Sequence, residues 1–294
     1  MNSIGIVGLG LMGNAIAHRL RSANFAVAGH DVDAGKRERF GAAGGTQVAS
    51  LAGLAPQCDT IFLAVFNTDQ VEQVIEGDAG LLNARRSSST PLTIVCTSTC
   101  DPDRIAQLAA RIESPRVGFI EMPVSGTSSQ VAKGEGVGLV AGTPRVNDAA
   151  SKALEAVCPR RQFLGAPGNG AKAKLAVNLV LGLNRGAMAE GLVLAQRAGL
   201  DPVAFLDVLR NSAAYSQVMD VKGSLMARRD FEKPQSRVDQ SYKDFSLMLD
   251  YSRTLGQRLP FAEVYAQLLR GCIENGEAEW DNAAIIAEIA RRRH

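Results

Sequence analysis

Three glycines near the start of the chain constrain its fold more than any other feature. Gly8, Gly10 and Gly13 have the spacing Gly-x-Gly-x-x-Gly, directly after an apolar run and before a helical pattern. In that setting the spacing is typical of a βαβ unit whose first turn binds the pyrophosphate of a dinucleotide. The glycines permit a tight turn, and the helix N-terminus supplies free N–H groups and a favourable dipole. The spacing alone is a weak signal, so the flanking sequence has to support it.

Short β-rich runs alternate with helical patterns over the first half of the chain. Strands separated by helices predict βαβ units and a parallel sheet covered on both faces, here a doubly wound α/β Rossmann domain. The expected strands are Ser3–Val7, Ala26–His30, Thr60–Val65, Leu92–Thr97, Phe119–Pro123 and Val137–Ala141, and the expected helices are Gly13–Arg21, Ala34–Phe40, Asp69–Ile75 and Pro102–Ile112.

The pattern changes after a turn-rich junction at residues 165–170, where strand-like alternation almost disappears. With 294 residues the chain is long enough for two cores. We therefore expect an NAD-binding Rossmann domain over residues 1–164 and an all-helical C-terminal domain for substrate binding and oligomerisation over 165–294. Its expected helices are Ala171–Ala198, Pro202–Asn211, Tyr215–Met226, Ser241–Leu255, Ala262–Glu274 and Asn282–Arg292.

Composition narrows the class of partner. The net charge of +2 and an aromatic content of 5% give no basic face or stacking platform for nucleic acid, which favours a small metabolite. The five cysteines include no CxxC pair, which favours reduced thiols without a metal site. The apolar stretch Ile4–Ala17 lacks a basic flank, and the one after Leu175 is broken by Asn178, Asn184 and Arg185. We expect a soluble cytoplasmic protein with no membrane partner.

Asp31 bears on the choice of cofactor. It ends the second expected strand, where a carboxylate accepts hydrogen bonds from the adenosine ribose and repels a 2′-phosphate. This favours NAD over NADP, although Lys36 and Arg37 lie nearby and soften the preference. The alternative is that Asp31 is a simple turn residue.

Two further strands end in segments that would face the same ligand. Ligands of open α/β sheets bind at the carboxyl ends of the strands, so Thr99 is expected near the nicotinamide ribose. The alternative for Thr99 is helix capping, since Thr99 and Asp101 precede Pro102. The cofactor contacts expected from sequence are Gly8, Gly10, Leu11, Met12, Gly13, Asp31, Val65, Phe66 and Thr99.

Lys174 and Asn178 lie four residues apart, just after the glycines Gly168 and Gly170, and so share one face of a helix. A lysine there suits acid–base chemistry at a substrate hydroxyl. Its free pKa is near 10.4, so a role as base requires partial desolvation, whereas as an acid it is already protonated. Lys172 points roughly 200° away and is the better candidate for a solvated charge. The histidines (His18, His30 and His294) have no comparable setting.

Four motifs in order carry a resemblance that covers essentially the whole chain. These are the Gly8–Gly13 pattern, Pro123-Val-Ser-Gly-Thr127, Gly168-x-Gly-x-x-x-Lys174-x-x-x-Asn178 and Lys243-Asp244. Together they resemble the β-hydroxyacid dehydrogenases, the family of 3-hydroxyisobutyrate dehydrogenase and tartronate semialdehyde reductase. The resemblance implies an active site between the two domains, with Lys174 as general acid–base and Asn178 holding the substrate. It also implies that Ser125, Gly126 and Thr127 bind the substrate carboxylate and that Lys243 reaches the cofactor.

The chain departs from the family pattern at two places. The family commonly shows Asp-Ala-Pro-Val-Ser-Gly-Gly where this chain has Glu121-Met-Pro-Val-Ser-Gly-Thr127, and the added hydroxyl of Thr127 suits a bond to a substrate oxygen. Ser236 stands where members often carry phenylalanine. Both positions bear on which substrate is bound more than on the type of reaction.

The sequence therefore predicts an NAD-dependent oxidoreductase of a small 3-hydroxy acid that resembles 3-hydroxyisobutyrate and gives the semialdehyde or keto acid. Two alternatives stay open. One is an imine reductase of the same architecture, against which Lys174 argues, and the other is a non-catalytic dinucleotide-binding protein. Long apolar helices in the second domain favour contacts between subunits. Members of the family that the chain resembles are commonly dimers or tetramers, so we expect a homodimer or homotetramer.

Overall fold

The computed structural model describes residues 3–86 and 88–292. The chain divides into two compact units, residues 1–174 and 175–294. The long helix α9 (Asn169–Arg197) belongs to both, because its first turns pack with the first unit and the rest with the second. The boundary expected at residue 165 lies in the turn before this helix, whereas the structural division falls inside it.

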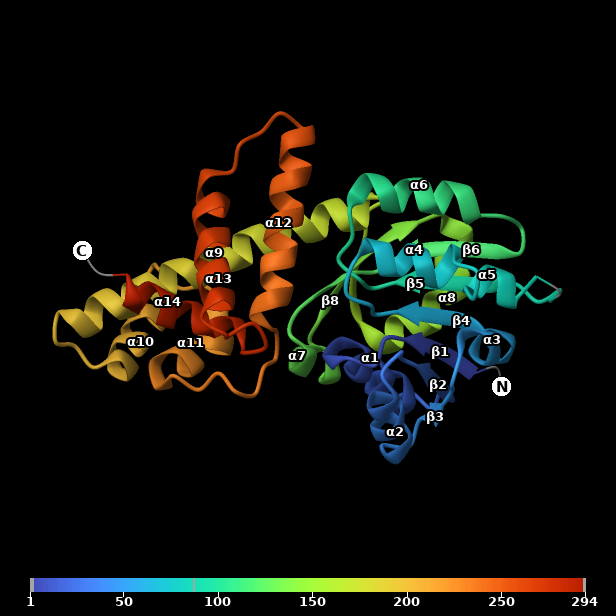
Figure 1. The fold of residues 1–294 in the computed structure, drawn as a ribbon, viewed down its shortest axis with the longest axis horizontal. Helices are drawn as coiled ribbons and strands as arrows, with labels where there is room; N and C mark the ends of the chain where they lie inside the picture. The colour runs from blue at the N-terminus through green and yellow to red at the C-terminus, as the bar shows by residue number, and fades with distance from the viewer. Residues whose placement is uncertain (1–2, 87, 293–294) are drawn as a thin grey trace. The chain divides into compact units, whose positions relative to one another are not determined.

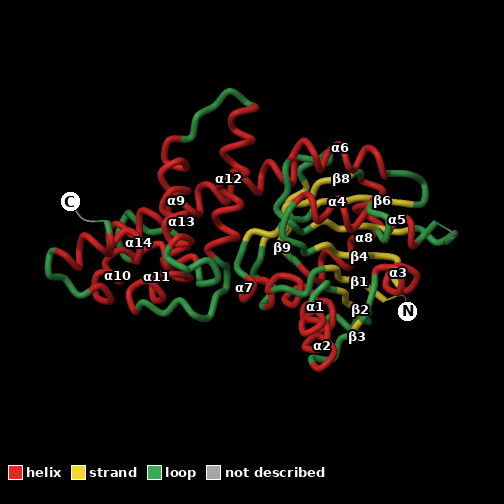
Figure 2. Tube along the Cα trace, in the orientation of Figure 1, coloured by secondary structure: helices red, strands yellow, loops and turns green. Residues whose placement is uncertain are grey.

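The first unit is built on one sheet with the strand order β3-β2-β1-β4-β5-β6-β8-β7, and β9 pairs with β8 (Figures 1 and 2). Neighbouring strands from β3 to β6 are parallel, as the alternating pattern predicts. The pairings of β8 with β6 and β7 are antiparallel, because the chain returns there through a short helix rather than a crossover. The strands are β1 Ser3–Val7, β2 Val27–His30, β3 Thr46–Gln47, β4 Cys58–Leu63, β5 Leu92–Cys96, β6 Val117–Glu121, β7 Val124–Ser125, β8 Val137–Gly142 and β9 Arg160–Phe163.

Helices cover both faces of this sheet. Along β4 the side chain of Phe62 packs in the apolar core under α1, α2 and α8, and Ile61 and Leu63 pack in the core under α3, α4 and α6. Both faces of the strand are therefore buried, which explains its continuous apolar sequence. The helices of this unit are α1 Leu11–Ser22, α2 Ala34–Ala42, α3 Leu51–Leu54, η1 Ala55–Gln57, α4 Thr68–Glu76, α5 Leu81–Ala84, α6 Pro102–Ile112, α7 Ser128–Ala132 and α8 Pro144–Val157.

The order of the strands fixes where a ligand of the first unit can bind. The chain proceeds outward from β1 in both directions, to β2 and β3 on one side and to β4, β5 and β6 on the other. Such a switch point leaves a crevice outside the carboxyl ends of the strands. Gly8, Asp31, Phe66, Thr99 and Glu121 all stand at or just beyond those ends.

The second unit is helical, and its described part contains no β-strand beyond one isolated bridge that joins Arg237 and Asp281. Its apolar core includes the fully buried ion pair of Lys222 with Asp281, 2.6 Å apart, whose carboxylate also accepts the N–H of Gln235 and Ala283. The elements after α9 are α10 Pro202–Arg210, α11 Val218–Arg228, α12 Val238–Thr254, α13 Pro260–Glu274, η2 Asn282–Ala284 and α14 Ile285–Arg291.

The structure confirms the expected fold class, an α/β Rossmann unit followed by helices. Over residues 3–86 and 88–292, every helix is too short or too polar to span a membrane.

Candidate active site

The three glycines of the first turn have three different roles. Gly8 adopts φ +95°, and a Cβ there would lie 2.5 Å from the Ala64 carbonyl oxygen, so the turn itself requires glycine. A Cβ on Gly13 would collide with the carbonyl oxygen of Gly8, so this glycine lets α1 pack against the end of β1. A Cβ on Gly10 would meet no atom within 4 Å. Since no packing demands Gly10, the open space above it and the uncapped N-terminus of α1 fit a pyrophosphate.

Asp31 is built into the same turn. Its side chain is 7% exposed, one carboxylate oxygen accepts the Leu9 N–H at 2.8 Å and the other accepts the Asp33 N–H at 3.0 Å. Each oxygen keeps a lone pair, so the carboxylate can still accept bonds from two ribose hydroxyls. Lys36 lies 3.6 Å from it, and Arg37 donates to the Asp31 carbonyl at 2.6 Å. Both nearby cations therefore already interact with Asp31, just after the end of β2.

Hydrogen bonds connect the segments at the carboxyl ends of β4 and β5. The hydroxyl of Ser98 donates to the Val65 carbonyl at 2.8 Å, and that of Thr97 donates to the Leu63 carbonyl at 2.7 Å. The Phe66 N–H donates to the Gln70 side chain at 2.8 Å. These bonds hold the segments that carry Val65, Phe66 and Thr99 at one edge of the sheet.

The N-cap of α6 is Asp101 rather than Thr99. The Asp101 carboxylate accepts the N–H groups of Asp103 and Arg104, at 3.0 and 2.9 Å. Asp101, one of the two residues on which the capping alternative rested, therefore caps this helix.

The loop after β6 has a positive φ and a helix cap. Gly126 adopts φ +140°, which restricts the position to glycine. Thr127 caps α7: its hydroxyl oxygen accepts the Gln130 N–H at 3.3 Å, and its own N–H donates to the Gln130 side chain at 2.9 Å. Thr127 therefore initiates a helix, and only its hydroxyl hydrogen could serve the expected substrate contact.

The two lysines at the start of α9 have different environments. Lys172 is exposed, whereas Lys174 is 8% exposed and its ammonium donates to the Val124 carbonyl at 2.6 Å. Helical periodicity explains the difference, since residues two apart face opposite sides. The partly desolvated ammonium of Lys174 lies beside the loop that contains Ser125, Gly126 and Thr127, all within the first unit.

Glu121 is a buried acid that the motifs did not single out. It ends β6, is 2% exposed, and its carboxylate accepts the N–H groups of Gly168 and, at 2.8 Å, Ala171. Burial raises the pKa of Glu121 to about 7, although these two bonds and the charge of Lys172 oppose the rise. Its only sequence signal is that the family usually has aspartate at this position.

Asp244 joins two of the expected residues in the second unit. Its carboxylate accepts the amide N–H of Asn178 at 3.0 Å and pairs with the Lys243 ammonium at 2.7 Å. The bond fixes the amide so that its nitrogen faces Asp244. Asp244 was missed as a site residue, although it stands in the Lys-Asp motif.

Further along α9, the helical face that carries Lys174 and Asn178 continues to Gly182 and Arg185, where it serves packing. A Cβ on Gly182 would lie 2.5 Å from the ring of Phe245, and the guanidinium of Arg185 donates to the Tyr265 hydroxyl at 2.9 Å. Arg185 is buried, and this bond holds it within the core of the second unit.

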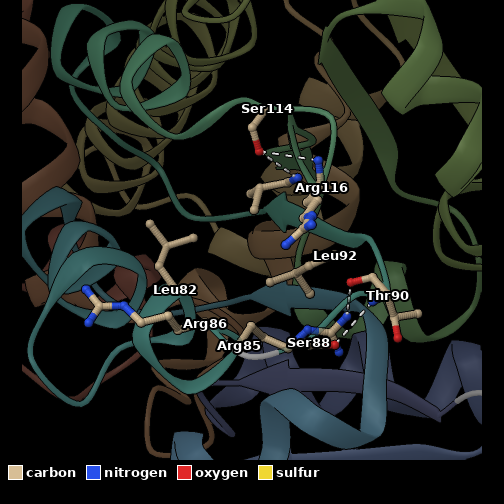
Figure 3. A pocket seen from close by; sticks show the side chains of 9 residues that line it. Leu82, Arg85, Arg86, Ser88, Thr90, Leu92, Ser114 and Arg116 are labelled. Atoms are coloured by element: carbon tan, nitrogen blue, oxygen red, sulfur yellow. Dashed lines mark hydrogen bonds between the residues drawn. The ribbon is translucent and has the colours of Figure 1, made fainter.

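A hollow of about 200 Å³ lies on a different edge of the sheet (Figure 3). It is found where β5 and β6 begin, beside Leu92 and Val117, whereas Gly8, Asp31 and Glu121 stand where the strands end. The buried guanidinium of Arg85 is used there to bond the carbonyls of Ala55 and Thr90, at 2.8 and 2.7 Å. This hollow is not the expected cofactor crevice. Among the described residues, no cluster of three or more histidine, cysteine, aspartate or glutamate side chains could hold a metal ion.

Two family models match the chain in succession. Residues 3–165 match the NAD binding domain of 6-phosphogluconate dehydrogenase. Residues 168–289 match a domain described as the NAD-binding domain of NADP-dependent 3-hydroxyisobutyrate dehydrogenase.

Full-length relatives are also found. The chain is 30% identical to an L-threonate dehydrogenase from Cupriavidus necator over 97% of its own length and 95% of the relative's. It is 28% identical to a 2-hydroxy-3-oxopropionate reductase from Escherichia coli, over 97% and 96% of the two chains. A crystal structure of 3-hydroxyisobutyrate dehydrogenase from Salmonella typhimurium matches with a TM-score of 0.87 and 26% identity, covering 98% of this chain and 99% of that one.

Proposed function

The chain belongs to the β-hydroxyacid dehydrogenase family, and on that premise we propose that it oxidises a small 3-hydroxy acid with NAD, or runs the reverse reduction, using Lys174 as the acid–base group. Members of this family are NAD(P)-dependent oxidoreductases acting on the CH–OH group of hydroxy acids. The observation that carries the assignment of Lys174 is its buried ammonium, 2.6 Å from the carbonyl of Val124 beside the loop at Ser125.

The chemistry of the reaction fits a lysine in this setting. Oxidation of an alcohol removes a hydride from carbon and a proton from oxygen, and bound NAD supplies the hydride acceptor. Lys174 takes the proton in this direction and returns it in the other, a role worth about 10²–10⁴-fold in rate. Fixed backbone N–H groups near Ser125 and Gly126 suit the substrate carboxylate because they need little reorganisation. Asn178, oriented by Asp244, is proposed to hold the substrate.

The proposed cofactor is NAD rather than NADP. The first-turn glycines leave room for the pyrophosphate at Gly10, and the charge of Asp31 opposes a 2′-phosphate. Lys243 is proposed to contact the cofactor. The proposed substrate class resembles 3-hydroxyisobutyrate, and the compounds tested should include L-threonate and 2-hydroxy-3-oxopropionate, after which two relatives are named.

One experiment tests the reaction and the role of Lys174 together. A panel of 3-hydroxy acids and their semialdehydes is monitored by NADH absorbance with the wild-type protein, Lys174→Ala and Lys152→Ala, which removes an exposed lysine of α8. We expect kcat to fall by about 10²–10⁴-fold in Lys174→Ala and to stay within about two-fold of wild type in Lys152→Ala. Turnover by Lys174→Ala near the wild-type rate would refute the mechanism. Tight NAD binding without turnover of any compound would favour a non-catalytic binding protein.

We further propose a homodimer or homotetramer. Several large apolar side chains of the second unit are exposed, among them Val180, Leu194 and Phe261, at 60%, 72% and 77%. Exposed apolar side chains mark a protein–protein contact surface where they form one contiguous patch, which is what the proposal requires of these residues. Sedimentation at several concentrations tests this, and a persistent monomer would contradict it.

A further inference from the structure

Glu121 lies where the end of β6 meets the start of α9. None of the motif residues accounts for a buried carboxylate at this place. Its carboxylate is almost fully buried and accepts the N–H groups of Gly168 and Ala171, the residues at the start of α9. Free N–H groups at a helix N-terminus carry partial positive charge, so a carboxylate is a favourable partner for them. The last residue of β6 thus holds the beginning of the helix that carries Lys174.

The glycines around this contact are explained by the same packing. Gly168 adopts φ +93°, and a Cβ on it would lie 3.0 Å from the Pro102 carbonyl oxygen. A Cβ on Gly170 would lie 3.0 Å from the Cβ of Glu121 and 3.0 Å from the Leu139 carbonyl oxygen. The Gly168-x-Gly170 pair therefore allows α9 to approach β6 closely enough for the carboxylate to reach the amides.

A second contact with α9 is made three residues after Glu121, at Val124, the first residue of β7. The Val124 carbonyl accepts from the Lys174 ammonium at 2.6 Å, so the segment from Glu121 to Val124 contacts both the first amides of α9 and its lysine. A shift of the first turn of α9 would move Lys174 relative to Ser125. Misplacement of a reacting group by 1 Å can cost about 10²-fold in rate.

We propose that Glu121 is a positioning residue for Lys174: its carboxylate holds the first turn of α9 against the end of β6 and thereby sets the place of the Lys174 ammonium beside the substrate loop. This inference rests on the proposed role of Lys174. The ionised carboxylate offers acceptors to both N–H groups, whereas protonation converts one oxygen into a donor and weakens the hold.

The surroundings of Glu121 define what else could titrate there. Lys172 acts on it from α9, and the Cys96 thiol acts on it from the neighbouring strand β5. The pKa of the buried Cys96 thiol is raised, so it stays neutral near pH 7. Glu121 is therefore the group whose charge changes in this range.

The test measures reduction of a semialdehyde by NADH, between about pH 5.5 and about pH 9. In this direction Lys174 acts as an acid and loses activity only as the pH rises, so a fall in kcat/KM toward low pH reports another group. We expect the wild type to show such a fall with a midpoint near 7. Glu121→Gln should lose it and have a kcat reduced by about 10²-fold with little change in the KM for NADH.

Two further variants are measured for comparison with Glu121→Gln. Glu121→Asp keeps the charge on a shorter side chain and should retain the acid-side fall, with activity between those of the wild type and Glu121→Gln. Glu155→Gln removes a carboxylate whose side chain is 71% exposed on α8 and should behave as wild type. If Glu121→Gln kept the wild-type pH profile and rate within about two-fold, the inference would be wrong while the role of Lys174 stood.

A readout without substrate separates this inference from the proposed function. In ¹⁵N-labelled wild-type protein, the amide resonances of Gly168 and Ala171 should shift with a midpoint near 7, and in Glu121→Gln they should not. If the Gly168 and Ala171 amide resonances in Glu121→Gln matched those of the wild type at every pH, the inference would be overturned even if the enzyme turned over. Titrating amides in a protein that turns over no compound of the panel would instead place the failure in the proposed function.

Discussion

Asp31 combines two tasks at the scale of a single residue. Its carboxylate orders the first turn by accepting the N–H groups of Leu9 and Asp33, and it also places a negative charge where the adenosine ribose is expected. Hydrogen bonds to a charged group contribute about 1.5–3 kcal/mol each, so loss of the charge should be measurable in cofactor affinity. Asparagine keeps one acceptor oxygen for these N–H groups, so Asp31→Asn removes the charge together with one of the two bonds.

We predict that Asp31→Asn lowers kcat/KM with NAD by about 10-fold and raises the ratio of kcat/KM with NADP to that with NAD, because the repulsion of a 2′-phosphate is removed. Steady-state kinetics with both cofactors measure the ratio. The control is Asp33→Asn, which removes a neighbouring charge but keeps an oxygen for the N-cap of α2, now bonded to the Lys36 N–H at 3.2 Å. An unchanged ratio in Asp31→Asn would argue for a turn residue only.

Site residues that belong to a motif could be predicted from the sequence. The residues that contact and orient them, from distant parts of the chain, could not. Lys174 and Asn178 stand out because their spacing puts both on one helical face. Glu121 and Asp244 act through contacts with segments 47 and 66 residues away, at Gly168 and Asn178, and no local pattern reports such pairs. Thr127 shows the converse: its hydroxyl suggested a substrate contact, while Gln130 three residues later is the signature of a capping box.

The junction of β1 with α1 shows how an element can be built for a ligand rather than for its own packing. Gly8 and Gly13 are demanded by backbone contacts, and Gly10 is not. Helix N-termini usually receive a side-chain cap, but α1 has none at Gly10. Its first N–H groups are thus suited to an external anion.

We predict that Gly10→Ala leaves the thermal midpoint within about 2 °C of wild type but weakens NADH binding by at least about 10-fold, because the new Cβ enters open space that the pyrophosphate needs. Gly13→Ala should instead destabilise the fold, since its Cβ would collide with the Gly8 carbonyl. Calorimetric titration with NADH and thermal scans measure the two effects. Loss of stability in Gly10→Ala with unchanged binding would contradict the assignment of the crevice.

Most strongly patterned elements could be predicted from the sequence, but one long helix and several short elements could not. The expected Ser3–Val7 and Pro102–Ile112 are found with the same bounds. The helix α8 (Pro144–Val157) was missed, although Pro144 at its first position and apolar residues at helical spacing are the usual signals. The strands β7 and β9 were not predicted, because each is short and is formed by its pairing with β8.

At the scale of the whole molecule, the pattern of the sequence separates a strand-and-helix half from a helical half, and the structure shows the same division of secondary structure. The division into compact units falls inside α9. Composition changes at residues 165–170, but burial of Ala171 and the bond of Lys174 to Val124 bring the first turns of α9 into the first unit. Long-range packing of this kind leaves no mark on local composition.

The titration of Glu121 also connects one residue to the stability of the fold. The pKa of its carboxyl rises from an ordinary 4.5 to about 7 in the folded chain. Between these pH values the folded state binds more protons than the unfolded state, so the free energy of unfolding falls as the pH rises through this window. At about 1.4 kcal/mol per pH unit, the contribution is on the order of 3 kcal/mol. Stability is therefore lost over the same pH range in which the carboxylate gains its hold on α9.

We predict that this contribution lowers the thermal midpoint of the wild type by several degrees between about pH 5 and about pH 8, followed by far-ultraviolet circular dichroism. Glu121→Gln carries no titrating group there and should show a clearly smaller difference between the two pH values, whatever its absolute midpoint. Glu155→Gln, whose carboxylate is exposed, should keep the wild-type difference. An equal pH difference in Glu121→Gln and the wild type would mean that another group causes it and that Glu121 is ionised throughout. In that case the acid-side fall in kcat/KM should also be absent from the wild type, so the two measurements check each other.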